Sequence, residues 1–190
     1  FMNWEKLIQE NRPLVITGTI NAYSALLAER VGIKAIYLSG GGVANASYGL
    51  PDLAMTSRED VLEDVRRIRS ASELPLLVDI DTGWGSALAI SRSIKEMISA
   101  GASGVHIEDQ VSEKRCGHRP NKEIVSSEEM VDRIKAAKDA QTDENFLLMA
   151  RTDAFAKGGL KEVIDRSNAF IEAGAGAIFP EAISTLRDYE

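Results

Sequence analysis

The only cysteine of this 190-residue sequence lies among cationic side chains. The segment reads Lys114-Arg115-Cys116-Gly117-His118-Arg119-Pro120-Asn121-Lys122 and holds one of the two histidines. Gly117 and Pro120 interrupt helices and strands alike, so we expect a loop here. Cationic neighbours favour the thiolate, which makes Cys116 a candidate reactive group. The alternative is a small buried apolar residue, and the charged surroundings argue against it.

Acidic side chains end two of the apolar runs that have the character of buried strands. Asp79 and Asp81 lie two residues apart and therefore share one face of a strand, and Glu108 ends the next run. Carboxylates gathered in one place repel one another unless a cation lies among them, and oxygen ligands select Mg²⁺ or Mn²⁺. The glycine-rich turn Thr82-Gly83-Trp84-Gly85 favours a metal site over an ordinary pair of solvated acids. One cysteine and two separated histidines do not suit a typical zinc site.

An arginine ends a further apolar run. Arg151 is a candidate clamp for a substrate carboxylate, and it is also a candidate structural partner of Glu181 or Asp153. His118 either hydrogen-bonds substrate or orders the cysteine loop, whereas His106 is expected to be an interior residue and not a catalyst. Lys114, Arg115 and Lys122 form either a solvated rim or a cationic loop over the acidic mouth, and the second arrangement suits a polyanionic substrate.

Strands and helices are expected to alternate along the whole sequence and to position these side chains. The expected strands are residues 14–17, 35–38, 76–80, 104–108, 146–150 and 177–179. The expected helices are residues 22–31, 57–70, 87–99, 126–140 and 160–172, with another starting at residue 183. A pattern of helix end, glycine and buried strand recurs at Gly32, Gly101 and Gly174. Near-continuous apolar strands separated by helices indicate a parallel sheet covered by helices.

Two α/β architectures fit this alternation, an open doubly wound sheet and a (β/α)8 TIM-type barrel. Polar residues end at least five of the expected strands, and a barrel gathers all such ends at one mouth. An open sheet would use mainly its switch point, and no Gly-x-Gly-x-x-Gly fingerprint follows the first strand. We therefore expect the barrel. Only about six βα units are present, whereas a full barrel typically has about 250 residues. Residues 1–190 are expected to form a single catalytic domain, incomplete on its C-terminal side.

Composition and charge narrow the range of partners. The net charge is −7 and no basic face offsets it, which argues against nucleic-acid binding. No apolar run approaches the length of a membrane span, and no signal-peptide pattern opens the sequence. A single cysteine cannot form an internal disulfide, which suits a reducing compartment. We expect a cytoplasmic protein whose partner is a small molecule and neither nucleic acid nor a membrane.

Several motifs taken together resemble the isocitrate lyase / phosphoenolpyruvate mutase superfamily. They are the cysteine loop, Tyr37-Leu38-Ser39-Gly40-Gly41-Gly42, Gly49-Leu50-Pro51-Asp52, Asp79-Ile80-Asp81-Thr82-Gly83, His106-Ile107-Glu108-Asp109-Gln110, Ala150-Arg151-Thr152-Asp153 and Phe179-Pro180-Glu181-Ala182. The Arg119-Pro120-Asn121 form of the loop is similar to that of the 2-methylisocitrate lyase branch. Isocitrate lyases have a similar loop but are much longer.

This resemblance implies a Mg²⁺-dependent carbon–carbon lyase, with Mn²⁺ as a possible substitute, that cleaves the tricarboxylate 2-methylisocitrate to pyruvate and succinate. The reaction belongs to the methylcitrate cycle of propionate catabolism. The alternatives are an isocitrate lyase and a phosphonomutase or oxaloacetate hydrolase of the same superfamily. The latter enzymes generally lack the Cys-Gly-His acid, so Cys116 discriminates against them. A non-enzymatic scaffold is a further alternative, and retention of the whole residue set counts against it.

The resemblance also implies a role for each matching residue. Asp79 and Asp81 would hold Mg²⁺, with Asp52 and Glu108 acting through water. Substrate would be held by Ser39, Gly40, Gly41, Gly117, Arg151 and Glu181. Cys116 would protonate the succinate carbanion, Tyr37 would be the base, and His118 would belong to the same mobile gating loop. Members of the superfamily form homo-oligomers, so a homotetramer is implied, and two of their substrate-binding arginines would fall beyond residue 190.

Overall fold

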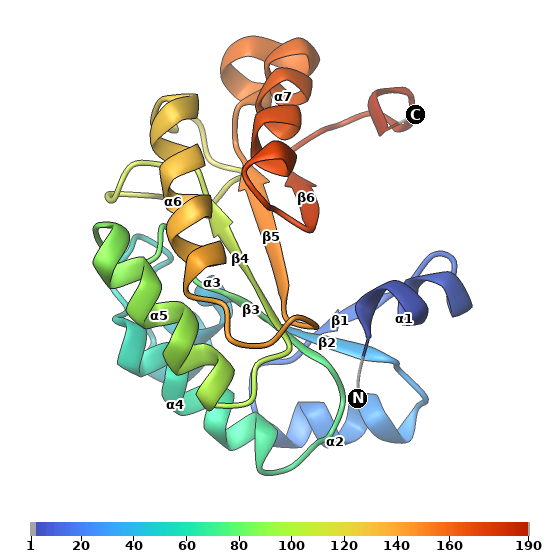
Figure 1. Ribbon diagram of the computed structural model, residues 1–190. Coiled ribbons are helices and arrows are strands. Elements are labelled where there is room, and N and C mark those ends of the chain that lie inside the picture. The colour runs from blue at the N-terminus through green and yellow to red at the C-terminus, as the bar shows by residue number, and fades with distance from the viewer. Residues whose placement is uncertain (1–2, 190) are drawn as a thin grey trace.

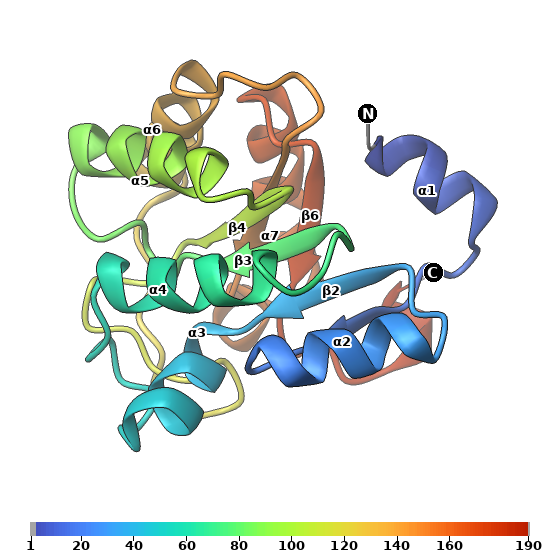
Figure 2. The ribbon, with the colours of Figure 1, turned by 90° about the horizontal axis from the view of Figure 1, so that it is seen from below.

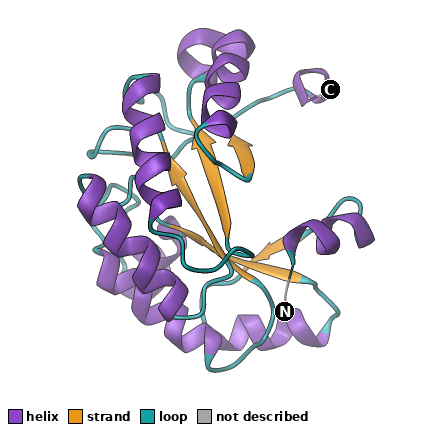
Figure 3. Cartoon of the chain, in the orientation of Figure 1, coloured by secondary structure: helices purple, strands orange, loops and turns teal. Residues whose placement is uncertain are grey.

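The structure is a computed structural model that describes residues 3–189. Six parallel strands form one sheet in chain order, and each pairs with the next along the sequence. They are β1 (Ile16–Gly18), β2 (Ala35–Leu38), β3 (Leu76–Asp79), β4 (Gly104–Glu108), β5 (Leu147–Thr152) and β6 (Ala177–Pro180). The sheet curls into a half-barrel whose convex face carries an arc of helices (Figures 1 and 3). The expected six parallel strands of a partial TIM-type barrel are thereby confirmed.

Five helices cover the convex face, and each follows a strand. They are α2 (Ala22–Arg30), α4 (Arg58–Arg69), α5 (Ala87–Ser99), α6 (Ser127–Asp139) and α7 (Phe155–Glu172). Helix α1 (Trp4–Glu10) lies on the opposite side of the sheet from α4 and α5 (Figure 2). Its anchor is Trp4, which is buried and donates a hydrogen bond of 2.8 Å to the carbonyl of Ser103.

The main hydrophobic core lies between the sheet and the outer helices. Its largest fully buried side chains include Leu62 of α4, Ile94 of α5 and Phe170 of α7. Burial of such side chains away from water supplies most of the favourable free energy of folding. The core therefore fixes the strands, and the strands fix the residues at their ends.

Side-chain caps set the starts of the helices that the sequence indicated. Ser57 accepts a hydrogen bond from the backbone N–H of Asp60, whose carboxylate accepts in turn from the N–H of Ser57. Ser126 accepts from the N–H of Glu129 at the start of α6. Each cap satisfies backbone donors that a helix start leaves unpaired. Ser57 and Ser126 therefore set where α4 and α6 begin.

Three local expectations differ from the structure. The three successive glycines at residues 40–42 are helical, although no helix was expected there. They form α3 (Gly40–Gly42), which has Ser39 as N-cap and leads into a π-helical turn η1 (Val43–Ser47). Helix α7 begins five residues earlier than expected and kinks at Gly159, where φ is 64°. The helix expected from residue 183 is wrong. Only a 3-10 turn, η2 (Leu186–Tyr189), forms there among the described residues, because Leu186 is 83% exposed and has little to pack against.

Replacing Leu62 by alanine should lower the free energy of unfolding by about 2–5 kcal/mol, because the side chain is fully buried in the core and its removal leaves a cavity. The matched control is Leu88→Ala in α5, since Leu88 is 84% exposed and the same atoms are removed. That change should stay within about 0.5 kcal/mol. Urea unfolding followed by circular dichroism measures both, and equal losses would contradict the assignment of the core.

Candidate active site

Polar side chains from five neighbouring strands meet at the carboxyl end of the half-barrel. The register places Asp79 of β3 beside His106 of β4, and Glu108 of β4 beside Arg151 of β5. Glu181 follows β6 directly. Parallel strands end on the same side of a sheet, so residues that are far apart in the sequence become neighbours. This is the mouth predicted from the polar strand ends.

Asp79 and Asp81 are both almost completely buried. Asp79 accepts hydrogen bonds from the backbone N–H groups of Gly40 at 3.0 Å and Asp81 at 3.1 Å. Gly40 has to be glycine for a steric reason, since a Cβ there would lie 3.0 Å from Asp81 Oδ1 and 3.2 Å from Asp79 Oδ2. The backbone of Asp81 has a φ of 47°, a left-handed conformation that is costly outside glycine. Local strain is thus tolerated to hold the second carboxylate beside the first.

The pKa values of the three carboxylates are shifted in different directions by burial and by neighbouring charges. Burial raises the pKa of Asp81, and the negative charge of Asp79 raises it further. It also raises the pKa of Glu108 well above its ordinary value. Asp79 behaves differently, because its interactions with His106 and with the charged Lys114 and Arg151 outweigh burial and lower its pKa. Three such groups resist being ionised together unless further positive charge is added.

Buried oxygens of these carboxylates lack hydrogen-bond partners in the described part of the chain. Glu108 Oε1 has none, whereas Asp81 Oδ1 and Glu108 Oε2 make ion-pair contacts only, 2.6 Å from Lys114 Nζ and 3.3 Å from Arg151 Nε. An unpaired buried polar atom is costly, so Glu108 Oε1 in particular calls for a ligand. Oxygen donors suit Mg²⁺, which keeps several waters and needs only one or two carboxylates. Between residues 3 and 189 no three histidine, cysteine or acidic side chains form a ready-made metal cluster. Asp79 and Asp81 stay the predicted protein ligands of such an ion.

Two lysines of the cysteine loop are buried and do not belong to a solvated rim. Lys114 Nζ is 2.6 Å from Asp52 Oδ1 and 2.6 Å from Asp81 Oδ1. Lys122 Nζ is 2.6 Å from Asp153 Oδ1. The solvated-rim alternative is wrong for these two lysines, because carboxylates at the mouth attract their ammonium groups inward.

Arg151 has the structural role that the sequence left open, and its role as a substrate clamp stays a prediction. Its guanidinium lies 3.0 Å from Asp153 Oδ2, 3.3 Å from Glu108 Oε2 and 3.4 Å from Glu181 Oε2. It also lies over the ring of Phe179, 5.5 Å from the centroid. The structural ion pairs are therefore present, and they hold the guanidinium at the mouth, where it can meet an anionic substrate.

The cysteine loop is seated on this ion-pair network. A Cβ on Gly117 would lie 2.5 Å from Arg151 Nη2 and from Glu181 Cδ, so only glycine fits there. His118 Nε2 is 3.3 Å from Glu181 Oε1 although its side chain is 80% exposed. Cys116 is half-buried, which is intermediate between the accessible reactive thiol and the buried apolar residue that the sequence left as alternatives. The loop thus brings Cys116 to the mouth without enclosing it.

Tyr37 meets the other side of the mouth. Its hydroxyl lies 2.8 Å from His106 Nε2 and 3.4 Å from Asp79 Oδ2. Burial raises the pKa of Tyr37 far above its ordinary value, and the charge of Asp79 adds to the effect. The phenol therefore keeps its proton, which disfavours the free phenolate that a simple base would require.

The glycine-rich segment is partly occupied by internal contacts. The N–H of Gly40 donates to Asp79, and Ser39 Oγ accepts from the N–H of Gly42 at 3.2 Å. Gly41 lies against Asp52, since a Cβ there would be 3.0 Å from Asp52 Oδ2. The role of this segment in binding a substrate carboxylate stays a prediction. The N–H of Gly40 already donates its hydrogen bond to Asp79.

Sequence reasoning missed a buried ion-pair network beneath the loop. Asp109 accepts hydrogen bonds from Thr152 Oγ1 at 2.7 Å, the N–H of Asp153 at 2.9 Å and Arg166 Nη1 at 3.1 Å. Arg166 also donates to the carbonyl of Val125. The available signal was the acidic pair at residues 108–109, of which only the first carboxylate faces the mouth. The network pins the base of the loop to β5 and α7.

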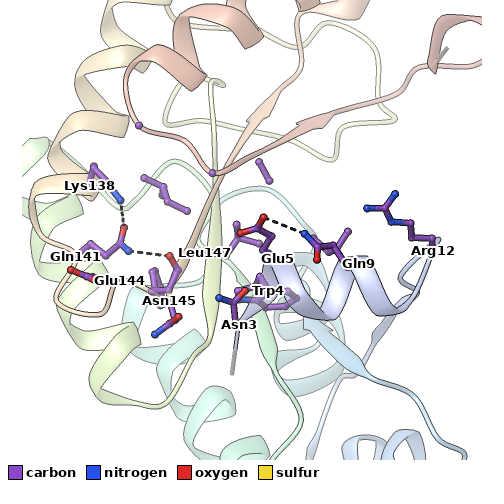
Figure 4. A pocket seen from close by; sticks show the side chains of 16 residues that line it. Asn3, Trp4, Glu5, Gln9, Arg12, Lys138, Gln141, Glu144, Asn145 and Leu147 are labelled. Atoms are coloured by element: carbon purple, nitrogen blue, oxygen red, sulfur yellow. Dashed lines mark hydrogen bonds between the residues drawn. The ribbon is translucent and has the colours of Figure 1, made fainter. Parts of the chain in front are cut away.

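Two further cavities lie away from the carboxylates. One, of about 470 Å³, lies between α1 and the segment that leads into β5, and it is lined by Trp4, Arg12, Lys138 and Gln141 among others (Figure 4). The other, of about 310 Å³, lies on the inner face of the sheet beside Tyr37 and His106. Its lining is mostly apolar, so it offers little to a charged ligand.

Comparison with known proteins adds independent information. A family model described as phosphoenolpyruvate phosphomutase matches residues 4–188. The chain is 62% identical over 188 residues to the 2-methylisocitrate lyase of Shewanella oneidensis, which covers 99% of this chain and 64% of that protein. The chain spans about three fifths of the length of the curated relatives that it matches.

Solved structures agree with the fold. A complex of oxaloacetate acetylhydrolase with 3,3-difluorooxalacetate matches with a TM-score of 0.89 at 33% identity, over 93% of this chain and 61% of that one. A complex of phosphonopyruvate hydrolase with oxalate and Mg²⁺ matches with a TM-score of 0.82 at 35% identity, over 92% of this chain and 60% of that one. The half-barrel therefore matches the corresponding part of longer enzymes.

Replacing Gly117 by alanine should lift the loop and make Cys116 react severalfold faster with iodoacetamide, because the added Cβ would collide with Arg151 and Glu181. Gly18→Ala is the matched control, since a Cβ on Gly18 meets nothing within 4 Å. Mass spectrometry of the peptide that contains Cys116 measures the rate. Equal rates in both variants and the unaltered protein would show that Gly117 does not seat the loop.

Proposed function

The chain belongs to the phosphoenolpyruvate phosphomutase family, and from this we propose that the protein is a Mg²⁺-dependent 2-methylisocitrate lyase that forms pyruvate and succinate. The observation that supports the proposal most is the cysteine loop seated on Arg151 and Glu181, at the same mouth as Glu108, whose buried Oε1 has no hydrogen-bond partner within residues 3–189. The identity of 62% with a 2-methylisocitrate lyase supports the same activity. The cleavage is proposed as a step of the methylcitrate cycle in propionate catabolism.

A tricarboxylate substrate requires concentrated positive charge at the mouth. Arg151 supplies a guanidinium that ion pairs already hold in place. We assign the metal to Asp79 and Asp81, with Asp52 and Glu108 acting through water. When bound, Mg²⁺ would supply the charge that stabilises the developing negative oxygen of the substrate. The Mg²⁺ in the related phosphonopyruvate hydrolase complex supports this assignment.

The cleavage needs one proton acceptor and one proton donor. The substrate hydroxyl loses its proton, its C–O becomes the carbonyl of pyruvate, and the broken carbon–carbon bond leaves its electron pair on the succinate fragment. Tyr37 can receive the proton without becoming a free phenolate if it passes its own to His106 Nε2, 2.8 Å away. Burial lowers the pKa of His106, so the ring is neutral and that nitrogen can accept in the matching tautomer.

Cys116 is the proposed donor to the succinate carbanion. A thiol suits this task because it can give up a proton near neutral pH and regain it afterwards. The loop carries it to the mouth on Gly117, and His118 contacts Glu181 at the rim. Closure of the loop would keep water from protonating the carbanion at the wrong moment. Ser39, Gly40, Gly41, Gly117 and Glu181 are proposed substrate contacts.

The rest of the assembly is proposed on resemblance. Residues 1–190 are taken as one catalytic domain of a homotetramer in the cytoplasm. No helix within residues 3–189 is both long and apolar enough to cross a membrane. The main alternative activity is that of an isocitrate lyase, which would release glyoxylate in place of pyruvate.

The complete protein, supplied with Mg²⁺ and 2-methylisocitrate, should release pyruvate and succinate in equal amounts. The Cys116→Ser variant should lose a factor of about 10² or more in turnover, because a hydroxyl is a far weaker acid than a thiol. A coupled lactate dehydrogenase assay measures pyruvate, and chromatography measures succinate and glyoxylate.

Isocitrate is the matched control substrate, because it lacks only the methyl group. Faster cleavage of isocitrate, with glyoxylate as product, would replace the proposed substrate. Undiminished turnover by Cys116→Ser would remove the proposed donor while leaving the lyase activity in place.

A further inference from the structure

A buried glutamine holds the backbone beside the proposed proton donor. Gln110 is 1% exposed and lies just after the end of β4. Its Nε2 donates a hydrogen bond of 2.9 Å to the carbonyl of Arg115, and its Oε1 accepts one of 3.2 Å from the N–H of the same residue. Cys116 is the next residue along the chain. This pair of bonds, the Gln110 tether, therefore ties the loop to the end of β4 directly beside the residue that carries the thiol.

The tether needs a primary amide. A backbone N–H requires an acceptor and a carbonyl requires a donor, and an amide side chain presents both in one plane. A glutamate of the same length would keep the acceptor and, when ionised, offer no donor. The side chain of Arg115 is exposed, so the link runs through its backbone and not through its guanidinium. The amide of Gln110 is thus the feature that fixes this part of the loop.

An arginine of helix α6 holds the glutamine in turn. Arg133 Nη1 donates to the carbonyl of Gln110 at 2.9 Å and to that of Glu108 at 3.2 Å. Its Nη2 donates to Glu129 Oε1, one helical turn earlier, at 2.7 Å. The arginine is 9% exposed, and a guanidinium keeps its donors in one rigid plane. A continuous path of hydrogen bonds therefore runs from α6 through Gln110 to the residue before Cys116.

The loop returns to the same glutamine at its other end. Gln110 pairs with Ile124 across an antiparallel bridge. The N–H of Val125 donates a hydrogen bond of 2.8 Å to the carbonyl of Asp109. Both ends of the segment that carries Cys116 are therefore anchored at one point of the sheet.

Cys116 has a fixed neighbour on each side. Arg115 before it is held by the tether, and Gly117 after it lies against Arg151 and Glu181, where a Cβ would be 2.5 Å from both side chains. A proton donor has to lie within hydrogen-bond reach of the atom that it protonates. A displacement of about 1 Å can lower a rate by about 10²-fold. Control of both neighbours is what such a donor requires.

We propose that Gln110 is a positioning residue that sets the location of the Cys116 thiol, with Arg133 as its support on α6. The inference rests on the proposed function, because that function gives the thiol its task, but the tether can be tested without substrate. Neither residue is among the proposed substrate contacts or metal ligands. Both act through the backbone of the loop and not on the substrate.

A second glutamine provides a matched control. Gln141 Nε2 donates to the carbonyls of Asp143 at 2.6 Å and Phe146 at 3.1 Å. It therefore also holds loop backbone, but beside the start of β5, at the opposite end of the sheet from the mouth (Figure 4). Gln141→Met and Gln110→Met remove the same amide, and only the second removes it from the Cys116 loop.

Steady-state kinetics of the complete protein with Mg²⁺ and 2-methylisocitrate test the proposal. Gln110→Met should lower kcat by about tenfold or more while KM changes by less than about twofold, because the donor is displaced and the substrate contacts remain. Its solvent deuterium isotope effect on kcat should rise, because proton delivery from Cys116 becomes the slow step. Arg133→Lys should act in the same direction, and the double variant should lose less than the product of the two single losses, because both act through one tether. Gln141→Met should match the unaltered protein in each respect.

Alkylation of Cys116 by iodoacetamide, without substrate, tests the tether alone. The rate should rise severalfold in Gln110→Met and stay unchanged in Gln141→Met, with circular dichroism to establish that both variants are folded. Gln110→Glu keeps the size of the side chain and one of the two bonds, and it replaces the methionine variant if that one does not fold.

Unchanged kcat and isotope effect in a folded Gln110→Met variant would overturn the proposal. So would equal losses in Gln110→Met and Gln141→Met, which would show only a general loss of structure. If the unaltered protein cleaves no 2-methylisocitrate, the proposed function fails, and equal alkylation rates in Gln110→Met and the unaltered protein would then overturn the tether as well.

Discussion

The structure depends on the balance of buried charge at the carboxyl ends of the strands. Asp79, Asp81 and Glu108 lie together where water is largely excluded, and burial raises the pKa of two of them. The positive charges of Lys114 and Arg151 form ion pairs with these carboxylates within the described chain. Glu108 Oε1 nevertheless remains without a hydrogen-bond partner there. A site of this kind is completed by a cation and an anionic ligand together, which is the chemistry of the proposed reaction.

The same balance links the scaffold to the mobile parts. The parallel register carries Glu108 and Arg151 to one level, and the core behind the sheet holds them there. The cysteine loop is then fastened by charge at both ends, through Lys114 at its start and Lys122 near its close. The loop that carries Cys116 is thus positioned by buried ion pairs and not by the apolar core.

The fold and the location of the site could be predicted from the sequence because both follow from local patterns. Alternating apolar runs and amphipathic stretches indicated the six strands, and polar strand ends indicated the mouth. The burial of Lys114 could not be predicted, because it depends on carboxylates from two other loops. The raised pKa of Tyr37 likewise arises from packing between β2, β3 and β4. Helix α3 and the π-helical turn η1 were missed because three successive glycines ordinarily disfavour a helix.

The central claim is that the carboxylates at the end of β3 hold a divalent cation. Titration of the complete protein with Mn²⁺, followed by electron paramagnetic resonance, tests it most directly. The account predicts one site per chain in the unaltered protein and binding weakened by a factor of about 10² or more in Asp79→Asn, which removes a charged ligand but keeps the shape of the side chain. Circular dichroism would establish that the variant is folded. Equal Mn²⁺ affinity in the folded variant would contradict the account.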